Sequence, residues 1–209
     1  EVLANSFIAP VVNAGGTVVT CPGSAVPLGG TPTASGGNPP FISYEWDMGA
    51  ANIANPVVSP NANTIYTLIV TDNAGCKQIG QSVVFVYRAN AGIDKSNCAG
   101  NPVLIGGAPI AGNTGVQYDW QPATGLSSTT AAQPFANPDG TSNYILTLTV
   151  PKTGGGTCIT KDSVTVTPVA APLEPNIAGP DKVLCLGDTL KIGTSGEPGF
   201  TYTWSPGFY

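Results

Sequence analysis

One cysteine-centred phrase occurs three times in the sequence, and this repeat constrains the fold more than any other feature. Each copy places a cysteine seven residues after an Ala-Gly start, and an aliphatic-Gly pair seven residues after the cysteine. The starts are 77 and then 87 residues apart, so each copy opens a repeat of the size of one small domain. The copies are AGGTVVTCPGSAVPLG from Ala14, AGIDKSNCAGNPVLIG from Ala91 and AGPDKVLCLGDTLKIG from Ala178.

The first two repeats continue through the same elements in the same order. A Tyr-x-Trp triplet comes first, followed by a proline-bounded segment, an alternating strand that begins with tyrosine, a late cysteine and a closing strand. The third repeat has the triplet but not the strand or the late cysteine, so we expect it to be the first half of a domain. We expect further residues of a parent chain to complete it, with strand addition by a neighbouring subunit as the alternative.

Short alternating strands between turn residues, about ten residues apart, are typical of an antiparallel β-sandwich. The 27 glycines and 20 prolines suit many turns, and no segment has a helical pattern. We therefore predict an all-β chain of tandem immunoglobulin-like sandwiches, arranged as beads on a rod. The predicted units are a preceding linker at 1–9, domains at 10–88 and 89–170, and an incomplete third domain at 171–209. The aromatic residues predicted to fill the cores are Trp46, Trp120, Trp204, Tyr66 and Tyr144.

The order of these elements resembles the immunoglobulin/PKD-like repeats of large cell-surface proteins of Bacteroidota. The motifs AGxDxxxCxG, Tyr-x-Trp, WxPxxGL, NPxxxP and YxLxV carry the resemblance over nearly the whole chain. YEWDMG, from Tyr44, is similar to the PKD phrase WDFGDG but lacks its second acid. Such repeats build gliding adhesins and other appendages exported by type IX secretion. The resemblance thus implies a secreted, cell-surface protein whose repeats supply length and display, with no catalytic residue.

The five cysteines are most simply explained as disulfide partners in an exported protein. Zinc is disfavoured because the chain has no histidine and no Cys-x-x-Cys pair. A cysteine nucleophile would also lack its usual imidazole base. We predict one bond within each complete repeat, near one pole of its sandwich, and an unpaired cysteine in the third. The predicted pairs are Cys21 with Cys76 and Cys98 with Cys158, and the unpaired residue is Cys185.

The charge and the apolar pattern of the sequence exclude nucleic acid as a partner and a membrane span in this segment. Seven basic and twelve acidic residues give a net charge of −5, and no basic cluster is present to neutralise nucleic-acid phosphates. No apolar run reaches the 18 or more residues expected of a membrane-spanning helix, so we predict no membrane span in this segment. Only 9% of residues are charged, and so weakly charged a surface predicts little mutual repulsion. We therefore expect like chains to associate into a homo-oligomer or fibre.

No constellation of enzyme residues is evident. The acidic side chains are scattered, and none forms the carboxylate pair of a glycoside hydrolase. A calcium ion between domains remains a minor alternative, although no Asp-rich loop supports it. Its ligands would be Asp94 or Asp181 together with Asp72 or Asp162. We predict that the chain is not an enzyme and carries no catalytic, metal or cofactor site.

Two functions remain open. The first is a structural repeat segment of a long extracellular filament or adhesin, which gives reach, stiffness and assembly for attachment to another cell or surface. The alternative is a module that binds glycans or cells through exposed loops of the sandwiches. Aromatic residues outside the repeat pattern would favour the alternative, and Phe41 and Tyr87 are the candidates. Both residues also fit as ordinary strand residues.

Overall fold

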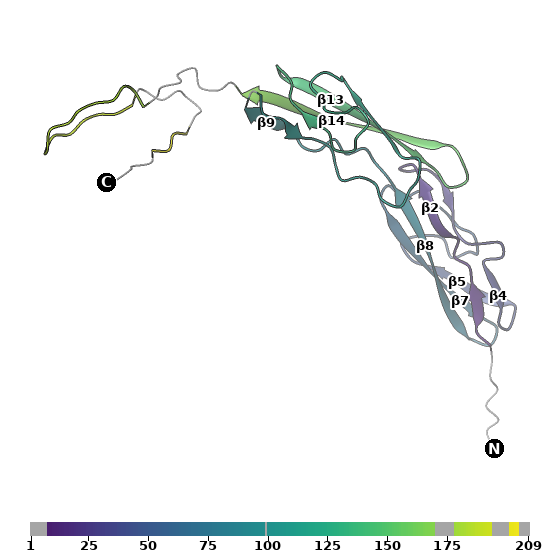
Figure 1. The fold of residues 1–209 in the computed structure, drawn as a ribbon. Helices are drawn as coiled ribbons and strands as arrows, with labels where there is room; N and C mark the ends of the chain where they lie inside the picture. Colours follow the sequence, from purple (N-terminus) through teal and green to yellow (C-terminus); the bar gives the residue numbers. More distant parts are fainter. Residues whose placement is uncertain (1–7, 99, 170–177, 194–200, 205–209) are drawn as a thin grey trace.

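A computed structural model describes residues 8–98, 100–169, 178–193 and 201–204. Within these residues the chain forms strands and turns and no helix. Figure 1 shows two β-sandwiches placed end to end, with strands running along the common axis. The predicted all-β fold of tandem, immunoglobulin-like sandwiches is thereby confirmed.

Domain 1 contains one four-stranded sheet in the order β2-β8-β7-β5 and two short two-stranded sheets, β1-β4 and β3-β6. Its strands pair antiparallel, except that β2 runs parallel to β8. The strands are β1 (Pro10–Val12), β2 (Gly16–Thr20), β3 (Val26–Pro27), β4 (Ala34–Gly36), β5 (Phe41–Trp46), β6 (Val57–Val58), β7 (Thr64–Asp72) and β8 (Lys77–Val86).

Domain 2 repeats this plan. Its four-stranded sheet has the order β11-β13-β14-β9, faced by the pair β10-β12, and β9 runs parallel to β14. The hairpin of β13 and β14 is the longest element described. The strands are β9 (Lys95–Cys98), β10 (Val103–Leu104), β11 (Gln117–Gln121), β12 (Phe135–Ala136), β13 (Ser142–Pro151) and β14 (Thr157–Val169).

The parallel strand of each domain fixes where its first cysteine lies. In domain 1, Thr20 is opposite Val86, so Cys21 lies at the far end of β8. In domain 2, Cys98 is opposite Val169, the last residue of β14. The first cysteine of each repeat therefore lies at the distal end of its domain, where the chain leaves the sandwich.

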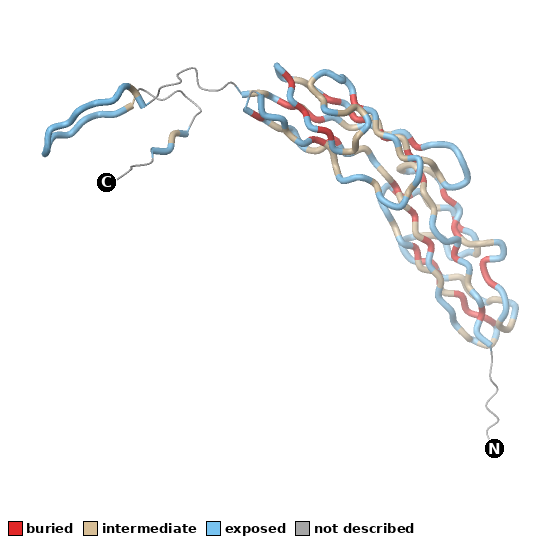
Figure 2. Tube along the Cα trace, viewed as in Figure 1, coloured by how far each residue is buried: buried red, intermediate tan, exposed pale blue. Residues whose placement is uncertain are grey.

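Each domain has its own apolar core, and Figure 2 shows the buried residues running along the inside of both sandwiches. Trp120 and Tyr144 have no exposed surface, while Trp46 and Tyr66 are 7% and 4% exposed. The indole N–H of Trp120 donates to the Ala131 carbonyl at 2.9 Å, which satisfies its only polar atom. These four predicted aromatic residues lie in the two cores.

The repeated phrase closes on itself through the same backbone hydrogen bond in all three copies. The glycine of each aliphatic-Gly pair donates to the carbonyl of the starting alanine, at 2.9 Å, 2.9 Å and 3.1 Å. Gly106 has a φ of +87°, and a Cβ there would collide with the Ala132 carbonyl and approach Trp120, so glycine is required. The phrase is thus a structural clasp at the edge of each sandwich.

The third copy of the phrase keeps its clasp but has no described strand. Trp204 was predicted to be a core residue, and this is corrected: 51% of its surface is exposed. The strands that pair with those of Trp46 and Trp120 follow the tryptophan in the chain, and the residues after Trp204 lie outside the described part. The remainder of the third unit falls on 171–177, 194–200 and 205–209, outside the described residues.

Candidate functional site: the junction between the two domains

The linker between the domains is held on both sides by hydrogen bonds. The Arg88 guanidinium donates to the Asn61 carbonyl of domain 1 at 3.1 Å. One residue later, the Ala89 N–H donates to Thr160 Oγ1 of domain 2 at 2.7 Å, and the Ala91 N–H donates to Asp162 Oδ2 at 2.8 Å. The linker therefore runs along β14, and it does not form a free hinge.

A second attachment comes from the turn of the β13–β14 hairpin, which reaches back onto domain 1 (Figure 1). Thr153 in this turn makes two hydrogen bonds with Val19 of β2. The Val19 N–H donates to Thr153 Oγ1 at 2.8 Å, and the Thr153 N–H donates to the Val19 carbonyl at 3.1 Å. Because β2 is an edge strand of its sheet, the turn pairs with backbone groups that β8 does not use.

A disulfide between Cys21 and Cys158 completes the junction. Cys21 follows β2, and Cys158 is the second residue of β14, opposite Val150 in the hairpin. Their Cα atoms are 5.3 Å apart, a normal separation for a disulfide. The bond therefore joins the distal end of domain 1 to the proximal hairpin of domain 2, beside the Thr153 contacts.

This bond corrects the predicted pairing of Cys21 with Cys76 and of Cys98 with Cys158. The prediction assumed that the two cysteines of a repeat lie at one pole. In fact the parallel strand carries the first cysteine to the pole opposite the hairpin that holds the second. The ten residues of β8 separate the two positions in domain 1, which is roughly 30 Å at 3.3 Å per residue. Cys76, Cys98 and Cys185 are free thiols.

The opposite pole of domain 1 is closed by a buried carboxylate. Asp72 has no exposed surface, and its oxygens accept the backbone N–H groups of Asn38, Ala74 and Cys76 at 2.9–3.0 Å. Burial alone would raise the pKa of Asp72, but these backbone donors outweigh burial and lower the pKa below its ordinary value. The carboxylate thus folds the β7–β8 turn back onto its own domain.

The other acidic residues considered as calcium ligands also accept hydrogen bonds from backbone N–H groups. Asp94 accepts the Thr165 N–H at 2.8 Å, and Asp162 holds the linker at Ala91. Asp72 lies at the outer pole of domain 1, whereas Asp162 lies beside the linker, and within the described residues no three acidic or cysteine side chains form a group able to hold a metal. The structure therefore does not bring the considered ligands together at the junction.

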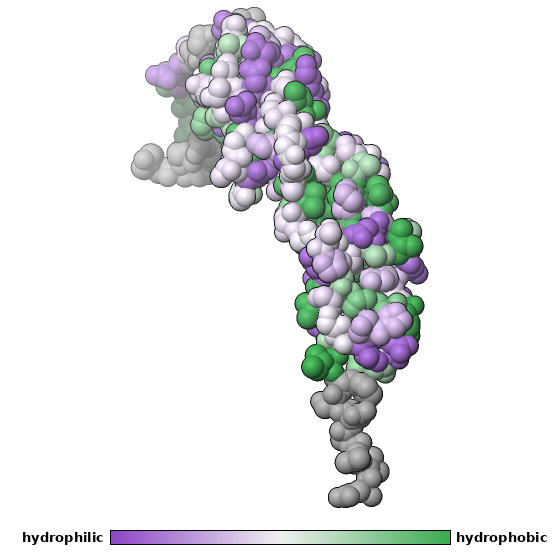
Figure 3. Space-filling view, turned by 90° about the vertical axis from the view of Figure 1, so that its right-hand side faces the viewer, coloured by the Kyte–Doolittle hydropathy of each residue, from purple (hydrophilic) through white to green (hydrophobic). Residues whose placement is uncertain are grey.

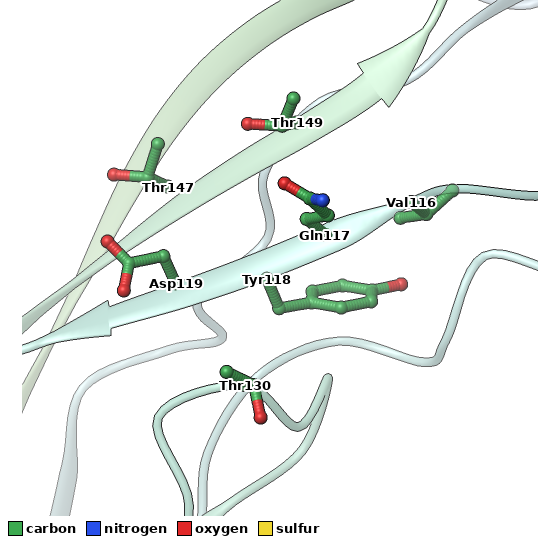
Figure 4. A pocket seen from close by; sticks show the side chains of 7 residues that line it. All are labelled: Val116, Gln117, Tyr118, Asp119, Thr130, Thr147 and Thr149. Atoms are coloured by element: carbon green, nitrogen blue, oxygen red, sulfur yellow. The ribbon is translucent and has the colours of Figure 1, made fainter.

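A shallow hollow lies on domain 2, over β11 and β13 (Figure 4). Gln117, Asp119, Thr147 and Thr149 project on one side of the strands, while Tyr118 leaves the opposite side. The Tyr118 hydroxyl accepts the Ile110 N–H at 2.9 Å and so ties down a loop. The hollow is thus lined by polar groups on one side of β11 and by the Tyr118 ring on the other side.

The surface is mixed in polarity. Figure 3 shows apolar side chains scattered among polar ones on the face in view. No helix among the described residues is long and apolar enough to cross a bilayer. Phe41 and Tyr87, the aromatic candidates for binding, contact other aromatic rings: Tyr44 at a centroid distance of 6.3 Å and Phe85 at 5.8 Å.

The sheet arrangement defines the class as tandem immunoglobulin-like β-sandwich domains. No family model and no curated protein matches the chain. Among solved structures, it is similar to immunoglobulin domains 1–4 of Sidekick-1, at 14% identity over 79% of this chain and 49% of that one, with a TM-score of 0.40. It is also similar to cadherin domains 1–4 of protocadherin gamma B7, at 12% identity, 78% and 50% coverage and a TM-score of 0.29. The fibronectin(III)-like modules of Clostridium thermocellum CbhA show 14% identity, 81% and 96% coverage and a TM-score of 0.27.

The chain thus spans about half the length of the first two of these proteins. The residues that hold the junction were not singled out from sequence, apart from the cysteines and Asp162. Thr153 and Thr160 are ordinary strand and turn residues in composition. A useful signal was nevertheless present, because the strand from Tyr144 to its late cysteine is longer than the corresponding strand from Tyr66.

Proposed function

We propose that this chain is a structural repeat segment of a long extracellular filament or adhesin. Its serial sandwiches give reach and direction for attachment to another cell or surface. The junction is the observation that supports this function most. Linker, hairpin turn and disulfide attach the two domains at separate points. A segment that only spaces and orients other parts needs such a fixed angle, because a flexible linker would let the rod fold back.

Several features support an extracellular, non-enzymatic role. Structural disulfides persist in oxidising compartments, where exported proteins reside. The acidic side chains at the ends of the domains bind backbone N–H groups and are not free for chemistry. A Bacteroidota origin, export by type IX secretion and a gliding or attachment appendage belong to the same proposal, and they rest on the motif order alone. Side-by-side association of like chains is also part of it.

The alternative, glycan or cell binding by exposed loops, has weaker support. The hollow of Figure 4 contains hydroxyl, amide and carboxylate groups that could accept a sugar. The one aromatic ring that lines it, Tyr118, leaves the opposite side of β11 from these groups and has its hydroxyl bound to the Ile110 N–H, while Phe41 and Tyr87 pack against neighbouring rings. These observations favour the structural role for this segment.

The native thiols allow a direct test of stiffness. Cys76 and Cys98 lie at the two outer poles of the two-domain rod, so spin labels there report its length. In a C185S background, we expect one narrow distance distribution, centred on the order of 70 Å from the lengths of β8 and β14. The C21S/C158S variant should show a broader distribution. Equal, broad distributions in both variants would contradict a role as a stiff spacer.

A further inference from the structure

The distal end of domain 2 has the same construction as the end of domain 1 that carries the junction. Asn97 is opposite Pro168 in the parallel pair β9–β14, just as Thr20 is opposite Val86 in β2–β8. The turn after the cysteine is also the same: the Asn101 N–H donates to the Cys98 carbonyl at 2.9 Å, and the Ser24 N–H donates to the Cys21 carbonyl at 3.1 Å.

The groups that dock the hairpin at Cys21 have counterparts at Cys98. Ser96 takes the place of Val19 in the edge strand β9, whose outer side has no partner strand among the described residues. Cys98 itself is an exposed free thiol. Beside it, Asn97 is only 6% exposed, and its amide oxygen has no hydrogen-bond donor among the described residues. Domain 2 therefore does not satisfy all the polar groups at this end by itself.

We propose that this end of domain 2 is a docking site for the β-hairpin of a further domain of the same repeat type. The hairpin would pair its turn with the edge of β9 at Ser96, and a cysteine near the start of its returning strand would bond to Cys98. The bond forms by oxidation of two thiols, with loss of two protons and two electrons to a disulfide oxidant such as oxidised glutathione. The inference deepens the proposed function, because it rests on domains placed in series.

The established junction explains why a domain of this type is the occupant. In domain 1, the equivalent edge residue, Val19, and the equivalent cysteine, Cys21, already bind such a hairpin through Thr153 and Cys158. A third copy of the cysteine phrase begins at Ala178, directly after domain 2. The intervening stretch, 170–177, is longer than the linker before Ala91. That extra length raises the entropic cost of docking only slightly, because the cost grows with the logarithm of loop length.

Domain 2 itself can serve as the probe. In an extended chain, residues 178–209 are replaced by a second copy of 91–169, so that the natural linker is retained. An I159V change in the second copy distinguishes its Cys158 peptide by mass, and Ile159 is a suitable position because it is 61% exposed. After refolding in a glutathione buffer, mapping without reduction should recover two links. One is Cys21–Cys158, and the other joins Cys98 of the first copy to Cys158 of the second.

The controls separate docking from random oxidation. C98S in the first copy should leave the second-copy Cys158 alkylatable, with Cys21–Cys158 unchanged. The proposal is overturned if Cys98 stays free while Cys21–Cys158 forms, or if the second copy bonds its own Cys98 to its own Cys158. A covalent dimer of the unextended chain through Cys98 and Cys76 would assign this end to a second copy of the chain and would also overturn it. A failure of the stiffness test would leave this disulfide map unaffected, so the two proposals fail separately.

Discussion

The β7–β8 and β13–β14 hairpins have the same turn but differ in how far they extend from their cores. In both, the first turn residue donates its N–H to a carbonyl four residues later, at 3.1 Å in β7–β8 and 3.0 Å in β13–β14. The buried tyrosine of the strand lies six residues before this turn in domain 1, from Tyr66 to Asp72. In domain 2 the buried tyrosine lies eight residues before the turn, from Tyr144 to Lys152. The second hairpin therefore extends about 7 Å further from its core.

This difference decides what each end does. The shorter turn is closed by Asp72 onto its own domain, and the adjacent Cys76 is a free thiol. The longer turn projects beyond its sandwich and pairs with Val19, and Cys158, which follows the turn in β14, bonds to Cys21. The two extra residues in each strand lie beyond the cysteine, which is six residues before the partner of the buried tyrosine in both hairpins, so they extend the reach of the turn to Val19. Since the side-chain period of a strand is two, this change leaves the inward-facing residues inward.

Shortening the second hairpin to the length of the first should abolish the disulfide. Deletion of Val150–Pro151 together with Ile159–Thr160 preserves the turn and the alternation, and it withdraws Cys158 by about 7 Å. That displacement takes the Cα pair beyond the reach of a disulfide. We expect both Cys21 and Cys158 to become alkylatable in the folded protein.

The deletion also removes the Thr160 hydroxyl that accepts the Ala89 N–H, and Thr160→Val controls for this loss. The control should retain the disulfide. If the shortened hairpin still bonded to Cys21, the distance of Cys158 from its own core would not be what brings the two cysteines together.

Asp72 should make the self-capped end sensitive to acid. Its pKa is lowered in the folded state, so its contribution to stability is present above the ordinary carboxyl pKa, near 4, and is lost as pH falls through the folded value. We expect Asp72→Asn to lower the midpoint of thermal unfolding of domain 1 at pH 7. The difference from the unsubstituted protein should shrink below about pH 4.

Asp94→Asn is the matched control, because Asp94 accepts a single backbone N–H in domain 2. It should have a smaller effect and leave the midpoint of domain 1 unchanged. A difference for Asp72→Asn that stays constant down to pH 2.5 would contradict the assigned role of the carboxylate.

The smallest effect concerns the docking end. Thr153→Val removes the hydroxyl that accepts the Val19 N–H and keeps the side-chain shape. One such hydrogen bond contributes about 0.5–1.5 kcal/mol. The equilibrium constant for forming Cys21–Cys158 against glutathione should therefore fall roughly two- to tenfold. Thr157→Val, in the same hairpin, should not change it, and equal falls in both variants would point to a general loss of strand stability.

Much of the fold could be predicted from the repeats, since the cysteine phrase, the Tyr-x-Trp triplet and the strand tyrosines recur in order. Trp120 and Tyr144 lie inside domain 2 because alternation places them on the inner face. The cysteine partners could not be predicted in this way. Sequence spacing gives no strand direction, and the parallel course of β2 along β8 is what sends Cys21 away from Cys76. The junction contacts of Thr153 depend on the same unpredicted pairing.

The Cys21–Cys158 bond has a mechanical consequence for a chain pulled from its two ends. The bond joins positions 137 residues apart, so force entering at β2 passes directly into β14. The enclosed segment, which includes nearly all of both cores, carries none of that force and cannot be drawn out. At about 3.5 Å per residue, the bond prevents roughly 480 Å of the enclosed chain from being extended. The redox state of one cysteine pair thus sets whether this rod can lengthen under load.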